Sequence, residues 1–201
     1  LNVSNWGADL GYFSDISTPS ISLPNKYYFS SGGAMRDYST LIDAFRQLPY
    51  TLLICCSKPA IEKHFPLPKN IIHYDFNANG YNSLSDLRYF NQNAKAVLIP
   101  ISKKNHVANG NSTFVEGLAC GKPILISNTG NNFLDVEYSN IGMKIGMLDT
   151  NDWVKKIHYL EANPGHVDEM SKNSYELAKS QYNYALFSKN IANNLRSLVE
   201  K

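Results

Sequence analysis

Polar side chains and one carboxylate gather in the segment 110–123, which lies between two apolar runs. A helix is expected to begin there, and its starting residues are Gly110, Asn111, Ser112 and Thr113. The first amides of a helix have no partner within it, and with the helix dipole they favour an anion such as phosphate. Glu116 follows within about one turn and could bind sugar hydroxyls. The segment therefore predicts a nucleotide-sugar site, with Gly110 allowing close approach of the backbone.

A second interpretation of the same residues is purely structural. Thr113 and Glu116 have the spacing of a capping box, in which the glutamate bonds back to the residue that caps the helix. The local sequence leaves ligand binding and capping equally open.

The loop after the first predicted strand is the next candidate. Gly32 and Gly33 permit a close backbone approach, and Arg36 could form a bidentate contact with a diphosphate. The alternative is that Arg36 pairs with Asp37 or another surface carboxylate, which would contribute little. A double glycine is weak evidence alone, and no GxGxxG or GxxxxGK[ST] motif is present.

Other candidates are weaker. Gly130 and Asn131 follow the fifth predicted strand and could bring amides to the same ligand, although alone they indicate a turn. His106 lies in a loop on the ligand side and is the candidate catalytic residue. No metal-ligand spacing and no GxSxG elbow occurs, so a metal site and a nucleophilic hydrolase are not supported.

Alternating apolar runs and amphipathic segments predict an α/β fold, with a Rossmann-like, doubly wound parallel sheet of about six strands flanked by helices. In such sheets the ligand lies beyond the carboxyl ends of the strands, which brings the loops 32–36, 74–82, 101–112 and 127–132 together. The predicted strands are 27–31, 50–56, 70–74, 96–101, 123–127 and 142–148. The predicted helices are 38–48, 83–93 (Leu84, Leu87 and Phe90 inward), 112–121 (ending at Gly121), 151–160, 167–181 and 184–199.

Composition limits the class of protein. The chain has 201 residues, of which 43% are hydrophobic and 18% charged, and its formal net charge is only +2, which is typical of a globular domain and disfavours nucleic-acid binding. The cysteines Cys55, Cys56 and Cys120 form no disulfide pattern, which favours a reducing cytoplasm. No apolar run is long enough to cross a bilayer.

Several segments resemble the C-terminal, donor-binding domain of GT-B-type glycosyltransferases, the "glycosyl transferases group 1" pattern. The most specific is 110–123, which is similar to G-x-x-x-x-E-A-x-A-x-G-x-P. Residues 3–13 resemble P-x-G-V-D-x-x-x-F, and 31–45 resemble G-x-x-x-x-K-x-x-x-L-I-x-A-F. Residues 140–148 resemble N-G-x-L-v-x-x-x-D. The likeness runs through nearly the whole chain.

The resemblance implies that the domain binds a nucleotide-diphosphate sugar of the UDP or GDP type as a substrate, with no cofactor and no required metal. It implies that Glu116 bonds the ribose and that Arg36 lies near the phosphate-binding position. It also implies that the helix start 111–113 faces the diphosphate, and that the loop after the third strand, with His73 and Tyr74, faces the base. The enzyme would be a hexosyltransferase-like enzyme of polysaccharide biosynthesis.

The resemblance also implies a domain organisation. Residues 1–26 would be an irregular lead-in from an N-terminal domain, 27–183 the nucleotide-sugar-binding domain, and 184–201 a helix packing towards the other half. That half would supply the acceptor site for a glycan or a lipid-linked substrate, so we expect no transfer by this chain alone. The expected location is the cytoplasm, with peripheral association at the membrane face as an open option.

One departure leaves the chemistry open. The family often has a second glutamate eight positions before Glu116, where this chain has Ala108. Either His106 or Asn109 takes the role of this glutamate near the donor sugar, or the subgroup differs from the family in this contact. The sequence therefore leaves open whether sugar transfer retains or inverts the configuration. A sugar-nucleotide epimerase of the same architecture and a non-catalytic binding subunit remain as alternatives.

Overall fold

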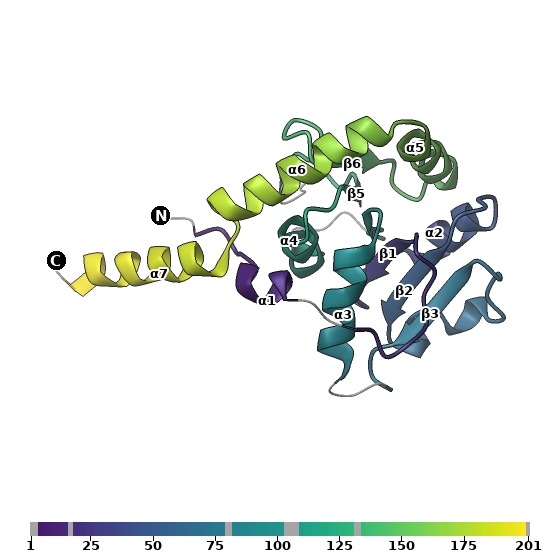
Figure 1. The fold of residues 1–201 in the computed structure, drawn as a ribbon, viewed down its shortest axis with the longest axis horizontal. Coiled ribbons are helices and arrows are strands. Elements are labelled where there is room, and N and C mark those ends of the chain that lie inside the picture. The colour runs from purple at the N-terminus through teal and green to yellow at the C-terminus, as the bar shows by residue number, and fades with distance from the viewer. Residues whose placement is uncertain (1–3, 16–17, 79–81, 103–108, 131–133, 200–201) are drawn as a thin grey trace.

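The computed structural model describes residues 4–15, 18–78, 82–102, 109–130 and 134–199. A six-stranded sheet in the order β3-β2-β1-β4-β5-β6 forms its centre, and every neighbouring pair is parallel (Figure 1). Doubly wound dinucleotide-binding sheets have this order, and their ligands bind where it reverses, which is here between β1 and β4. The strands are β1 (Tyr28–Ser31), β2 (Leu52–Cys56), β3 (Ile71–Asp75), β4 (Val97–Ile99), β5 (Ile124–Ser127) and β6 (Gly142–Ile145).

Helices cover both faces of this sheet. One buried cluster joins the sheet to α2 and α5, and a second joins it to α3 and α4. The long helix α6 begins against the first cluster and ends against the second. This confirms the predicted α/β class. The helices are α1 (Leu10–Ser14), α2 (Tyr38–Phe45), α3 (Asn82–Asn93), α4 (Asn111–Ala119), α5 (Thr150–Ala162), α6 (Pro164–Gln181) and α7 (Tyr184–Val199), with 3₁₀ turns at Lys58–Ala60 and Glu62–His64.

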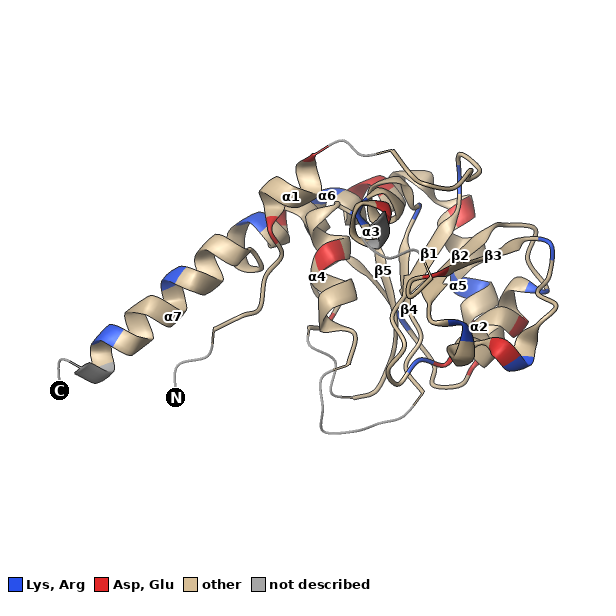
Figure 2. Cartoon of the chain, turned by 90° about the horizontal axis from the view of Figure 1, so that it is seen from below, with Lys and Arg blue, Asp and Glu red and all other residues tan. Residues whose placement is uncertain are grey.

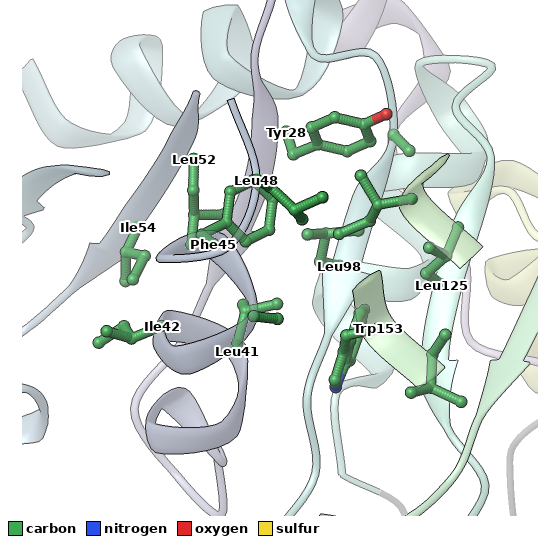
Figure 3. Packing of buried hydrophobic residues seen from close by; sticks show 14 of the residues in the cluster. Tyr28, Leu41, Ile42, Phe45, Leu48, Leu52, Ile54, Leu98, Leu125 and Trp153 are labelled. Atoms are coloured by element: carbon green, nitrogen blue, oxygen red, sulfur yellow. The ribbon is translucent and has the colours of Figure 1, made fainter. Parts of the chain in front are cut away.

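The core beneath α2 shows why the apolar runs become strands. Leu41 and Phe45 of α2 pack onto the sheet beside Leu98 and Leu125, and Trp153 of α5 fills the space next to them (Figure 3). All five are buried. Burial of each such side chain contributes about 1.5–3 kcal/mol, so this packing fixes α2 and the loop that precedes it.

Two strands end earlier than the apolar pattern predicts. β4 stops at Ile99, before Pro100, which has no N–H to continue a ladder. β6 stops at Ile145, three residues before Leu148, whose φ of 55° turns the chain.

The segment 1–26, expected to be irregular, contains the short helix α1, which Asp9 caps.

The predicted inward position of Leu84 is wrong, because its side chain is 61% exposed. Leu84, Leu87 and Phe90 recur every three residues, and each such step rotates by 60° around a helix. Phe90 is buried, and Leu84 therefore rotates out of the contact face, where its carbonyl accepts a bond from the Tyr12 hydroxyl at 2.8 Å.

Helix α7 extends away from the sheet, and the N-terminal segment runs beside it (Figure 1). Two backbone bonds fix their crossing: Ala8 N–H donates to Tyr182 at 3.0 Å, and Tyr184 N–H donates to Ala8 at 2.8 Å. Trp6 contacts Phe187 with a ring separation of 6.0 Å, while Leu195 is largely exposed. Figure 2 shows basic positions along α7, whose residues include no Asp or Glu.

In the part of the chain that the structure describes, no helix combines the length and the apolar character needed to cross a bilayer.

Candidate functional site

The start of α4 lies at the carboxyl edge of the sheet, where the chain leaves β4. Its N-cap is Gly110, with a φ of 86° and no side-chain cap. A Cβ at this position would stand 2.7 Å from Ile99 Cγ2, so glycine allows both the conformation and the packing. Within the described residues, the amides of Asn111, Ser112 and Thr113 have no acceptor. These exposed donors and the helix dipole favour an anion.

The capping-box interpretation is wrong. Thr113 is the third residue of α4 rather than its cap, and its hydroxyl lies 3.2 Å from Ser31 Oγ, in a contact between the first turn of α4 and the end of β1. Glu116 is six positions beyond the cap Gly110, too far to bond back to it. The other end of the helix agrees with the prediction: Cys120 is the C-cap, and Gly121 follows with a φ of 60°.

Arg36 lies beside this helix start, in the loop between β1 and α2. Its guanidinium donates to the carbonyls of Ser31 at 3.0 Å and Ala34 at 3.3 Å, and to Thr113 Oγ1 at 3.3 Å. Arginine has five N–H groups, so two remain without an acceptor among the described residues. Gly32 has a φ of 99°, which favours glycine, and a Cβ there would lie 2.9 Å from Arg36 Nη2 and displace the guanidinium.

The expected alternative, an ion pair of Arg36 with Asp37, does not form. Asp37 instead caps α2 by accepting from the Thr40 amide at 3.2 Å. In the described part of the chain, no carboxylate lies within ion-pair distance of Arg36. Burial lowers the pKa of Arg36, yet arginine stays protonated. A partly buried cation without an acidic partner favours an anionic ligand.

Two hollows adjoin at this place. The one around Arg36 has a volume of about 300 Å³ and is lined by the loop after β1 and the start of α4. The other has a volume of about 350 Å³ and extends over the ends of β2 and β3. They share Gly32, Gly33, Ser112 and Thr113. Further lining residues are Ala34, Arg36, Asn109, Gly110 and Asn111 in the first, and Ser31, Cys55, Cys56, Ser57, Phe76, Asn77, Leu87 and Glu116 in the second.

Glu116 places a carboxyl group in the larger hollow. No hydrogen-bond or ion-pair partner of this group occurs among the described residues. Burial raises its pKa from 4.5 to about 7, because a charged carboxylate is poorly solvated there. The thiols of Cys55 and Cys120 interact electrostatically with this carboxyl group. Such a group can accept bonds from a ligand that brings its own donors.

His73 and Tyr74 do not line either hollow. His73 Nε2 lies 3.0 Å from the Cys56 carbonyl, and the Tyr74 hydroxyl donates to the Asp86 carboxylate at 2.6 Å on the other side of β3. The loop that follows does reach the larger hollow, through Phe76 and Asn77.

Gly130 follows β5 with a φ of 78°, and its amide donates to Asn128 Oδ1 at 3.2 Å. It is not among the residues that line the two hollows. His106, Ala108 and Asn131 lie outside the described residues.

The sequence pattern does not single out the lining at the end of β2, which is Cys55, Cys56 and Ser57. The available signal is topological: β2 is parallel to β1, so both strands end at the same edge. The residues of β2 are apolar, so the sequence alone does not indicate that the end of this strand lines a site.

No cluster of three or more His, Cys, Asp or Glu side chains that could hold a metal ion occurs in the described ranges.

Comparison with known proteins places the fold among glycosyltransferases. A glycosyltransferase from Rickettsia africae superimposes with a TM-score of 0.73 at 14% identity, over 98% of this chain and 56% of its own. Anabaena Alr3699/HepE in complex with UDP gives 0.71 at 15% identity, over 95% of this chain and 56% of its own. The C-terminal domain of the group 1 glycosyltransferase LpcC from Francisella tularensis gives 0.66 at 16% identity, over 89% and 100%.

No protein-family model and no curated protein sequence matches the chain. The chain spans about half the length of the Rickettsia and Anabaena structures. It has the fold of one Rossmann-like half of a GT-B glycosyltransferase.

Proposed function

We propose that this chain is the donor-binding half of a glycosyltransferase, which moves a sugar from a nucleotide-diphosphate sugar to an acceptor hydroxyl. The single observation that carries the proposal is the adjacency of the two hollows. One presents Arg36 and unpaired helix amides, and the other presents the carboxyl group of Glu116. A nucleoside diphosphate has the complementary pair of features: an anion, which is joined to a pentose with two hydroxyls.

The roles of the residues follow from this placement. The diphosphate lies against the amides of Ser112 and Thr113 and the free N–H groups of Arg36. The ribose hydroxyls donate to Glu116, and the base lies against Phe76 and Asn77. Structures of this fold bind UDP and UDP-glucose in Anabaena Alr3699/HepE and DTDP in VinC. A uridine-type donor is therefore the first to test.

Catalysis would be mainly electrostatic. As the bond between the sugar and the diphosphate breaks, negative charge builds on the leaving phosphate. In this proposal the helix-start amides and the Arg36 guanidinium face that position before the bond breaks, so little reorganisation would be needed. Arg36 lies on a loop fixed by the bond from the Asp37 amide to the Pro100 carbonyl at 3.0 Å.

The acceptor, a glycan or a lipid-linked hydroxyl, is proposed to bind with a second half comparable to the rest of the matched structures. The exposed apolar side chains of α7, including Ile191 and Leu195, would pack towards that half. A cytoplasmic location, association with the membrane face and a role in polysaccharide biosynthesis belong to the same proposal.

The test is calorimetric titration of the chain with UDP, GDP, ADP and CMP, repeated on two arginine variants. Arg36→Ala should weaken binding of the preferred diphosphate by roughly ten- to a hundredfold, because it removes charged hydrogen bonds, and should leave uridine binding unchanged. Arg36→Lys should restore only part of the loss, since lysine lacks the planar fork.

Arg46→Ala is the matched control, because Arg46 forms only an exposed pair with Asp43 at 3.0 Å. If no nucleotide binds, or if both alanine variants behave alike, the proposed function is wrong.

A further inference from the structure

The peptide between Gly32 and Gly33 is held on one side only. The amide of Gly32 donates to the Cys55 carbonyl at 3.0 Å, and its carbonyl accepts from the Tyr38 hydroxyl at 2.5 Å. The preceding carbonyl, of Ser31, accepts from Arg36 Nε. The N–H of the Gly32–Gly33 peptide belongs to Gly33, and it has no acceptor among the described residues.

Peptide geometry gives the direction of this free amide. In a trans peptide, the C=O of one residue and the N–H of the next point in opposite directions. The Gly32 carbonyl points to Tyr38, which is buried at the start of α2 and lines neither hollow. The Gly33 N–H therefore points away from that core. Gly33 lines both hollows, and space around it is open.

Tyr38 is well suited to hold this arrangement. Its side chain is only 2% exposed, and burial raises its pKa, so the hydroxyl remains a donor throughout the physiological pH range. Asp37 caps the same helix turn, which fixes the start of α2. Gly32 has a φ of 99°, a conformation that glycine adopts without strain. The hydroxyl thus selects one orientation of a peptide that glycine alone would leave free to rotate.

We propose that Tyr38 is a positioning residue, which orients the Gly32–Gly33 peptide so that the Gly33 amide binds the diphosphate opposite the α4 amides. This rests on the proposed function and adds a donor and its support to that site. The anion would then be bound from both sides of the switch point, by Gly33 after β1 and by Ser112 and Thr113 in α4.

The experiment is an amide-resolved NMR titration of the wild-type chain with inorganic pyrophosphate and with UDP. We expect the Gly33 amide proton to shift downfield together with those of Ser112 and Thr113. If the two α4 amides respond and Gly33 does not, the positioning role is wrong and the proposed function stands. If none responds to either compound, both are wrong.

Variants add a second readout. Tyr38→Phe keeps the buried ring but removes the donor, and should weaken UDP binding by roughly three- to tenfold while reducing the Gly33 shift. Tyr27→Phe is the control, because the Tyr27 hydroxyl also bonds a carbonyl, that of Phe90 at 3.2 Å, outside the hollows. Unchanged UDP affinity in folded Tyr38→Phe would overturn the proposal. If this variant does not fold, the wild-type titration decides.

Discussion

Glu116 should make the stability of the chain depend on pH in a direction opposite to that of most acidic residues. Its pKa is raised by burial from 4.5 to about 7, so the folded state binds a proton that the unfolded state has already released between these values. By linkage, the free energy of unfolding then falls as the pH rises through that window. The difference between the two pKa values corresponds to about 3 kcal/mol as an upper value.

The perturbation is Glu116→Gln, which keeps the shape of the side chain and removes the charge. Near pH 4.5 and below, the variant and the wild type should have similar free energies of unfolding. By pH 8 the variant should be more stable by up to about 3 kcal/mol, because no charge remains to be buried. Urea unfolding at several pH values measures this difference, and other titrating groups cancel in it.

Ligand binding should show the reverse preference. Ribose hydroxyls that donate to Glu116 favour its charged form, so UDP affinity should increase by about tenfold between pH 6 and pH 8 in the wild type. In Glu116→Gln this dependence should disappear and binding at pH 8 should be weaker. Glu176→Gln is the control, since Glu176 forms only an exposed pair with Lys179 at 3.2 Å. A difference between Glu116→Gln and wild-type stability that stays constant from pH 4.5 to 8 would refute the reasoning.

The remaining predictions concern the backbone and the thiols around the site. Gly110→Ala should lower the free energy of unfolding by roughly 1–3 kcal/mol in urea, since φ is 86° and the new Cβ would lie 2.7 Å from Ile99 Cγ2. Gly33→Ala, with no atom within 4 Å of its Cβ, should cost less, and equal losses would contradict this account. Burial raises the pKa of Cys55, Cys56 and Cys120 to about 12, so at pH 8 they should react with a disulfide reagent only when urea unfolds the chain. Rapid labelling of the folded chain would contradict that expectation.

The fold could be predicted well because its signals are local and repeated. Apolar runs such as Leu52–Cys56 are buried on both faces, as parallel strands between two helix layers require. The end of a helix or strand could be predicted where a single residue decides it, as Gly121 does after α4. The sequence could not predict features that tertiary contacts decide. The three-residue spacing of Leu84, Leu87 and Phe90, for example, does not show which of these side chains is buried.

The site could be predicted only in part, for a related reason. Thr113 and Glu116 have the same spacing in a capping box and in a ligand site, and the sequence cannot separate the two. The choice depends on Ser31 and Arg36, which lie about eighty positions away in the chain and approach Thr113 only when β1 and β4 pair. In the same way, Ser57 and Phe76 enter the lining through the parallel order of β1, β2 and β3.

The groups that the fold leaves without protein partners support the proposed site more directly than the sequence motifs do. Arg36 is a partly buried cation without a carboxylate, Glu116 is a partly buried acid without a donor, and the amides of Gly33 and Ser112 have no acceptor among the described residues. Desolvation of the two charged groups lowers stability, while the two amides lie at exposed residues and can bond water until a ligand replaces it. Their charges and donors match one ligand that carries an anion beside free hydroxyls. Their meeting at one edge of the sheet is the structural basis for the ligand site that we propose.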